Sequence, residues 1–423
     1  MDPRKRRTKP LERVGGLQSE RDRREALEVL GRAFNNPAMI EQHVGRSLWQ
    51  PPIFDPEHTR VGVVDGRVVA VVVMGPRTIR FGPVEVEAMT IGPLGTHDRY
   101  RRHGYMAATM NDASDYMKRS GVLVAYLQGI GDFYYRFGYY PYMARSDVRF
   151  QRDDARRQAQ PGRLRAMRRD DLERVRQLYD AAARGRMCAG VRDDRVWEWL
   201  WRAGRRSWMF CGPRLVLDAR GRLRGYLTLR PGKELQVREI VVRDDEQSCR
   251  VTLGAIAREA KRREVKEIIL PLAWDDPLSL FLRQYVGAEF RMYPHPTGGA
   301  LMKVVDFLAL MRRLEPLFDR RWKEAGRALG KVRFVLESEV GAVGIEVGAR
   351  RTGAGVRVRE PAGEPAVRRV RIPQRWLSGL LTGYYTPRDV APRKGARIPA
   401  ALMPVMEVLF PPRWPWVYQA ENY

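Results

Sequence analysis

The stretch that decides the fold is Arg99-Tyr100-Arg101-Arg102-His103-Gly104-Tyr105-Met106, which lies between a predicted strand at 84–96 and a predicted helix at 104–120. The N-terminus of a helix has unpaired backbone N–H groups and a partial positive charge, so it attracts anions. Glycine lets an anion approach the backbone, and Arg101 and Arg102 add positive charge. The stretch therefore predicts a pyrophosphate-binding loop, and a basic turn before a surface helix is the alternative.

The predicted order of elements occurs twice along the chain. In each copy a helix is followed by a hairpin, a strand, a helix and another strand. The first copy contains the turn Asp65-Gly66, a strong hairpin signal, and the second runs from a helix after Asp170 to a strand at 268–272. The two copies share little sequence, so we infer a duplication of fold. A third region, from near Lys303, has helices and strands with period-two alternation.

The charge of the chain is strongly positive, at +27 from 77 Lys and Arg and 50 Asp and Glu among 423 residues. Such a field attracts polyanions. The basic residues are spread through all regions and Arg is far commoner than Lys, which favours arginine-rich solvated faces over a dedicated binding surface. No RNA-binding aromatic pattern or helix-turn-helix signal is present, so a nucleic-acid partner is not expected.

The three cysteines, Cys188, Cys211 and Cys249, have no metal-ligand spacing, and the five histidines are scattered. We therefore expect no metal. No run of about 18 uncharged apolar residues occurs, so neither a transmembrane helix nor a membrane partner is expected. The basic N-terminus, 4–7, is followed by no apolar segment and does not have the pattern of a secretory signal. We expect a cytoplasmic protein.

A second motif, Gly131-Asp132-Phe133-Tyr134-Tyr135-Arg136-Phe137-Gly138-Tyr139, follows the loop after one helix and one strand. Together the two motifs resemble those of the GNAT superfamily of acetyltransferases. Arg101 and Gly104 match its acyl-CoA-binding pattern Arg/Gln-x-x-Gly-x-Gly/Ala, and Met106 stands where Gly or Ala is usual. The resemblance implies acetyl-CoA as the co-substrate, with the loop on its pyrophosphate.

The resemblance also implies which residues do the chemistry. The strand before the loop splays from its neighbour in such enzymes, and its free N–H groups contact the pantetheine arm and the thioester. Tyr134 stands where the family has a tyrosine near the coenzyme sulfur, which suits a general acid; a packed aromatic is the alternative. The implied coenzyme-binding residues are Leu94, Gly95, Thr96, Arg101, Arg102, His103, Gly104 and Tyr105.

Taken end to end, the chain resembles the "enhanced intracellular survival" family of acetyltransferases. The resemblance implies an α+β fold with mixed α/β sheets: a catalytic GNAT domain at 1–154, a degenerate GNAT-like domain at 155–302, and a sterol-carrier-protein-like domain at 303–423. It also implies a homo-oligomer, the hexamer. The second domain has Arg243-Asp244-Asp245-Glu246-Gln247-Ser248-Cys249 in place of the loop, without glycine and with three acids, so we do not expect it to bind coenzyme A.

The aromatic C-terminal tail is too apolar to remain in water, so we expect it to pack into the protein. By resemblance its last α-carboxylate, on Tyr423, enters the active site as the general base; an ordinary frayed terminus is the alternative. Candidate substrate-binding residues are Phe34, Asn36, Trp49 and Glu421. Asn36 stands where an acid would suit a polycation, which argues against aminoglycosides.

The predicted function is acetyl-CoA-dependent N-acetyltransfer to a primary amine, on a small amine, an aminoglycoside-like molecule or a lysine. Tyr134 is the predicted acid and the Tyr423 carboxylate the predicted base. One alternative is a catalytically degenerate acetyltransferase fold that binds nucleic acid or an anionic surface through its basic charge. Another is a C-terminal lipid-carrying module.

Overall fold

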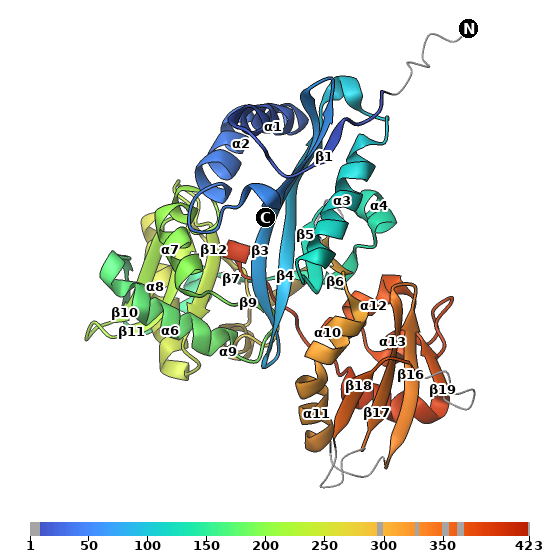
Figure 1. The fold of residues 1–423 in the computed structure, drawn as a ribbon. Coiled ribbons are helices and arrows are strands. Elements are labelled where there is room, and N and C mark those ends of the chain that lie inside the picture. The colour runs from blue at the N-terminus through green and yellow to red at the C-terminus, as the bar shows by residue number, and fades with distance from the viewer. Residues whose placement is uncertain (1–8, 294–298, 326–329, 349–354, 362–367, 422–423) are drawn as a thin grey trace.

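The computed structural model describes residues 9–293, 299–325, 330–348, 355–361 and 368–421. Three bodies are visible in Figure 1: an N-terminal unit at the top, a second unit at the lower left and a C-terminal unit at the lower right. All three combine helices with sheets, which confirms the predicted α+β class. In the described ranges no helix is long and apolar enough to cross a membrane.

The N-terminal unit is built on one large sheet with the strand order β1-β2-β3-β4-β5-β15-β6, and β9 pairs with β3. The helix α1 begins at Glu20 because the Ser19 hydroxyl caps it, accepting from the Asp22 N–H at 3.1 Å. Its strands are β1 (Arg13–Gly15), β2 (Thr59–Val64), β3 (Arg67–Phe81), β4 (Val84–Thr96), β5 (Val124–Gln128), β6 (Tyr140–Met143), β9 (Met187–Gly190) and β15 (Ala300–Val304). Its helices are α1 (Glu20–Ala33), α2 (Pro37–Ile40), α3 (Tyr105–Arg119) and α4 (Gly131–Tyr134), with a π-helical segment at Glu41–Leu48.

The second unit has two separate sheets, β12-β11-β10-β8 and β13-β7-β14. The predicted order of elements is present here, and the structure adds the strands β7, β8 and β14 and the helices α5, α7 and α9. The strands are β7 (Arg145–Gln151), β8 (Gly162–Ala166), β10 (Pro213–Asp218), β11 (Leu223–Leu229), β12 (Val237–Val242), β13 (Glu267–Leu270) and β14 (Glu289–Tyr293). The helices are α5 (Arg152–Ala155), α6 (Leu172–Ala183), α7 (Asp194–Arg202), α8 (Glu246–Arg262) and α9 (Pro277–Tyr285).

Two strands connect these units across the predicted boundaries. β7, from the predicted first domain, lies between β13 and β14 of the second unit. β15, which contains the 302/303 boundary, lies between β5 and β6 of the first sheet. The division at 154/155 and 302/303 stays a prediction about the chain, while the sheets themselves are shared across it.

The C-terminal unit has the sheet β18-β17-β16-β19, with β16 and β19 parallel. Its helices pack against the lower end of the N-terminal sheet, and the two units share one apolar core that includes Phe81, Met302 and Phe318. Its strands are β16 (Val332–Ser338), β17 (Gly341–Val347), β18 (Val356–Arg359) and β19 (Arg368–Arg371), and its helices are α10 (Phe307–Arg313), α11 (Glu315–Glu324), α12 (Gln374–Thr382), α13 (Pro387–Val390) and α14 (Met403–Leu409).

The C-terminal tail leaves this unit and ends near the middle of the molecule, between the N-terminal sheet and the second unit (Figure 1). The Trp416 N–H donates to the Met187 carbonyl at 2.9 Å, which aligns the tail with β9. Val417, Tyr418 and Ala420 are buried. The prediction that the tail packs into the protein is therefore confirmed as far as Glu421, and Tyr423 lies outside the described residues.

Candidate coenzyme and acceptor site

A cavity of about 340 Å³ lies where β4 meets the start of α3. Most of the predicted coenzyme residues line it together, and α4 contributes Phe133, with Arg136 following it. The predicted residues in its lining are Leu94, Gly95, Thr96, Arg101, Arg102, Gly104 and Tyr105. Sequence reasoning therefore brought together residues that the structure places around one space.

The start of α3 is open toward this cavity. Gly104 precedes the helix with φ +83°, a left-handed conformation that favours glycine, and a Cβ there would meet nothing within 4 Å. Gly104 has no side chain to cap the helix, so the first N–H groups of α3 stay available to an anion. Arg101 lies beside them, held by Asp98 at 2.6 Å, with about half of its side chain exposed.

The edge of β4 is open in the same place. β4 pairs with β3 as far as Thr96, but with β5 only from Ala88 to Thr90. The His97 N–H donates to β3, and N–H directions alternate along a strand, so the groups of Leu94 and Thr96 face the gap whereas that of Gly95 faces β3. Two of the three predicted backbone donors therefore face the gap.

A glycine at position 95 is required by the packing of α1 on β4. A Cβ at this position would lie 2.7 Å from the Cβ of Ala33 in α1. The glycine therefore lets α1 pack closely on β4, which supports the wall of the gap.

His103 and Tyr105 use their side chains inside the protein. The Tyr105 ring is buried and its hydroxyl donates to the Lys9 carbonyl at 2.7 Å. The His103 ring stacks on Tyr105, with centroids 5.7 Å apart, and its Nδ1 lies 2.7 Å from the Arg101 carbonyl. The two rings brace the loop, and Tyr105 meets the cavity at the first turn of α3.

Tyr134 is buried beside the cavity. Its ring packs edge-on against Phe133, with centroids 4.9 Å apart, and a side chain at Gly129 would collide with it. Burial raises the pKa of Tyr134 to about 12, so the phenol is protonated at neutral pH. The ring is thus a packed aromatic whose protonated phenol lies next to the end of β5.

The four candidate substrate residues do not come together in one pocket. Asn36 caps α2, its Oδ1 accepting from the Met39 N–H at 3.0 Å, and Phe34 is exposed at the end of α1. Trp49 is only 2% exposed, and its Nε1 donates to Thr59 Oγ1 at 2.9 Å. These interactions give Asn36 and Trp49 structural roles in the first unit.

Glu421 takes part in a buried ionic network rather than in an open pocket. Its carboxylate accepts from Arg192 at 2.7 and 3.1 Å, and the same guanidinium donates to Glu239 at 2.9 and 2.8 Å. Arg192 also lies 3.9 Å from the ring centroid of Tyr179. Sequence reasoning missed Arg192, because nothing in its local sequence, one arginine among many, indicates a partner so far along the chain.

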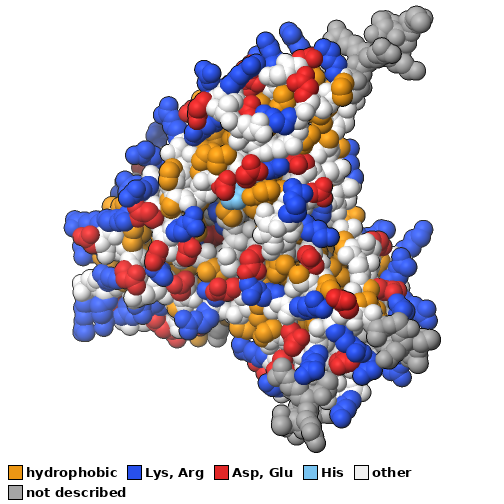
Figure 2. Space-filling view, viewed as in Figure 1, with side chains coloured by type: hydrophobic (Ala, Val, Ile, Leu, Met, Phe, Trp, Pro, Cys, Tyr) orange, Lys and Arg blue, Asp and Glu red, His pale blue; other side chains and the backbone are white. Residues whose placement is uncertain are grey.

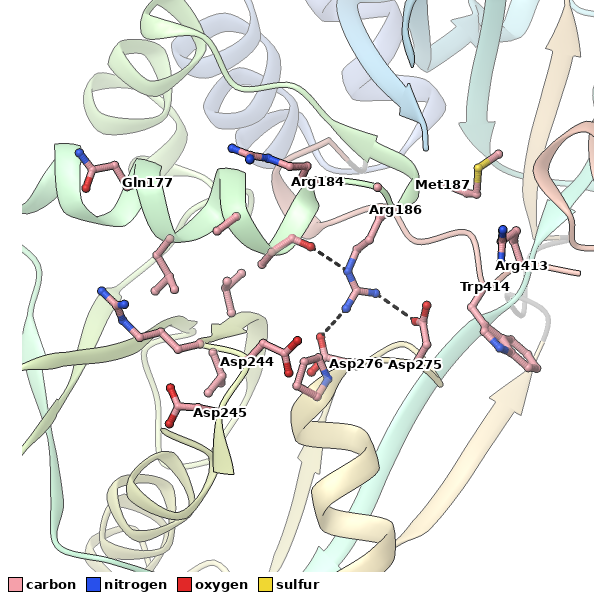
Figure 3. A pocket seen from close by; sticks show the side chains of 18 residues that line it. Gln177, Arg184, Arg186, Met187, Asp244, Asp245, Asp275, Asp276, Arg413 and Trp414 are labelled. Atoms are coloured by element: carbon pink, nitrogen blue, oxygen red, sulfur yellow. Dashed lines mark hydrogen bonds and ion pairs between the residues drawn. The ribbon is translucent and has the colours of Figure 1, made fainter. Parts of the chain in front are cut away.

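The corresponding place in the second unit is a cavity of about 700 Å³, at the end of β12 and the start of α9 (Figure 3). Asp245 closes the start of α8, because its carboxylate accepts from the N–H and hydroxyl of Ser248 at 2.7 and 2.8 Å. Arg186 lies between Asp275 and Asp276, at 3.1 Å from each. A protein carboxylate thus occupies the helix terminus that α3 leaves open, which supports the expectation that this copy does not bind coenzyme A.

Comparison with known proteins agrees with this geometry. Residues 17–142 match the family described as "Acetyltransferase (GNAT) domain". No curated protein matches the chain in sequence. The matched region is thus a GNAT acetyltransferase domain, and the protein is an enzyme, an N-acetyltransferase.

Solved structures match nearly the whole chain. A probable N-acyltransferase from Enterococcus faecalis V583 matches with a TM-score of 0.74 and 15% identity, over 97% of this chain and 99% of that one. A GCN5-related N-acetyltransferase from Anabaena variabilis ATCC 29413 has a TM-score of 0.72 and 15% identity, over 97% and 100%. Eis1 from Mycobacterium abscessus matches with a TM-score of 0.64 and 18% identity, over 97% of this chain and 100% of that one. At these identities the matches show a common fold.

Proposed function

We propose that the protein transfers the acetyl group of acetyl-CoA to a primary amine. The observation that carries this proposal is the single cavity lined by the open start of α3 and the unpaired edge of β4. The pyrophosphate would accept from the N–H groups that follow Gly104, with Arg101 and Arg102 adding charge. The pantetheine arm would run along β4 past Thr96 and Leu94.

In the proposed reaction the neutral amine attacks the thioester carbonyl, a C–N bond forms and the C–S bond breaks. Tyr134 gives its proton to the departing thiolate, whose basicity rises in the same dry surroundings. The α-carboxylate of Tyr423 takes the proton of the amine. Support for this base comes from the described tail, which reaches Gly190 beside β3 at Glu421.

Other parts of the proposal rest on the family resemblance. The acceptor is a small amine, an aminoglycoside-like molecule or a lysine, and the assembly is a hexamer in the cytoplasm. The C-terminal unit is sterol-carrier-like and holds the tail. On the visible face, Lys and Arg are interleaved with Asp and Glu instead of forming one basic stripe (Figure 2), which favours a small acceptor over the alternative of a nucleic-acid surface.

The test is acetyl-CoA turnover on a panel of aminoglycosides, polyamines and lysine peptides, with wild type, Tyr134→Phe and a deletion of 422–423. We expect both variants to lose most turnover while they still bind the coenzyme. A deletion variant with near-normal rates would exclude the carboxylate as the base. Salt-dependent binding of DNA or RNA, with no turnover on any amine, would favour the alternative function.

A further inference from the structure

A further cavity, of about 190 Å³, lies between the two sheets of the second unit. β12 and β13 correspond in order to β4 and β5, but they belong to separate sheets. Arg145, at the start of β7, and Arg238, on β12, line this space together with tail residues 416–419. The partial separation of β4 from β5 in the first unit is complete between β12 and β13 in the second, and the space between those two strands is a cavity next to the tail.

The carboxylates around this cavity are already engaged by other groups. Asp147 accepts from Arg149 at 2.9 Å. Glu239 accepts from Arg192 at 2.8 Å and from the Tyr226 hydroxyl at 2.7 Å. Both carboxylates thus already have an arginine partner, and among the described residues neither forms an ion pair with Arg145 or Arg238.

Both arginines have unused donors. The Nε atoms of Arg145 and Arg238 are buried without a hydrogen-bond partner, and among the described residues neither guanidinium forms an ion pair. Burial lowers the pKa of Arg145, and the nearby charge of Arg238 lowers it further, yet arginine stays cationic at neutral pH. Two neighbouring guanidinium groups with free donors favour an oxyanion, which can accept from both.

We propose that this cavity is an anion subsite in which Arg145 and Arg238 hold a carboxylate or phosphate group carried by the acceptor amine. The proposal rests on the proposed N-acetyl transfer and specifies its acceptor. A physical link supports it: Arg145 donates to the side chain of Gln128, and Gln128 precedes the Gly129 against which Tyr134 packs. The subsite therefore adjoins the strand end that holds the proposed acid.

The first test is binding, and it does not depend on turnover. The melting temperature of the full-length protein is measured against millimolar inorganic phosphate and against acetate, for wild type, Arg145→Gln, Arg238→Gln and the control Arg369→Gln. The control substitution Arg369→Gln removes the same charge, but from a partly exposed ion pair with Glu337 in the C-terminal sheet. We expect phosphate or acetate to stabilise wild type and the control, and Arg238→Gln to abolish the effect. An equal effect in all four proteins would overturn the subsite.

The second test compares matched acceptors: lysine with 1,5-diaminopentane for a carboxylate, and phosphoethanolamine with ethanolamine for a phosphate. We expect wild type to prefer the anionic member of one pair by about tenfold in kcat/KM, and Arg238→Gln to move that ratio toward one. Arg145→Gln also loses the hydrogen bond to Gln128, so a folding defect could explain its loss of activity. Arg238→Gln keeps that bond and therefore tests the subsite separately from folding. Turnover without preference in either pair overturns the subsite but leaves acetyl transfer intact. If no amine is acetylated, the proposed function is wrong, and so is the proposal that the anion belongs to an acceptor amine. The melting experiment then tests only whether the cavity binds anions.

Discussion

Arg192 and Glu421 form a buried ion pair although 229 positions separate them in the sequence. Their side chains are 0% and 2% exposed, and Nε lies 2.7 Å from Oε1. Glu239 of β12 binds the same guanidinium at 2.8 Å. Arg192 therefore connects three parts of the molecule: the segment after β9, which contains it, β12 of the second unit and the tail. Its ion pair with Glu421 holds the last described part of the tail against the first unit.

The first prediction concerns this pair. Glu421→Ala leaves Arg192 with one carboxylate instead of two and removes the contact that fixes the tail, so we expect a loss of about 3 kcal/mol in unfolding free energy. Urea denaturation would measure it, and acetyl-transfer rates should fall with it. The control is Glu324→Ala, in an exposed pair with Arg320, for which we expect little change. Equal effects of the two substitutions would show that the tail is not held by this pair.

The second prediction separates phosphate binding from backbone strain. Gly104 and Gly121 have φ of +83° and +74°, and a Cβ at either position meets nothing within 4 Å. Alanine at either site should cost about 1 kcal/mol of stability. Only Gly104 lies in the cavity, so Gly104→Ala alone should weaken acetyl-CoA binding, by about tenfold, in calorimetric titration. Comparable weakening by Gly121→Ala would contradict the assignment of the loop.

The third prediction concerns the proton on Tyr134. Tyr134→Phe should lower kcat by about 100-fold, the scale of a lost general acid, with the coenzyme affinity unchanged. Because the pKa of Tyr134 is raised to about 12, the wild-type rate should not decline near pH 10 through loss of this proton. Tyr135→Phe, whose ring stacks on Tyr140 instead, is the control. A decline near pH 10 that disappears in Tyr134→Phe would show that the phenol titrates normally.

The fourth prediction is a pH dependence of stability through His43. The ring stacks on Trp208 at 3.8 Å, and burial lowers its pKa to about 3. Between about pH 6.5 and 3 the His43 imidazole is protonated in the unfolded chain but neutral in the native state. Its contribution is thus present above pH 6.5 and is lost as pH falls toward 3, by about 1.4 kcal/mol per pH unit. Urea titrations at several pH values should show this slope in wild type and a smaller one in His43→Phe; identical slopes would refute it.

Local patterns predicted the strand, loop and helix start that surround the proposed coenzyme cavity. Gly104 after a strand and before a helix has a local physical meaning, and the same holds for the turn at Asp65-Gly66, whose φ angles of 48° and 66° are those of a hairpin turn. The local sequence around Trp49 and Asn36 does not indicate whether such a side chain faces a pocket or the core, and only the structure shows their hydrogen bonds within the first unit.

The sequence by itself determined the order of the main elements, the loop at Arg101–Gly104 and the apolar character of the tail, since each depends on neighbours a few residues away. Only the tertiary structure decided that β15 completes the first sheet, that β7 belongs to the second unit and that Arg192 meets Glu421. Strand pairing and buried ion pairs join distant segments, and their energies come from the partner's geometry and from the exclusion of water, which no short stretch of sequence records.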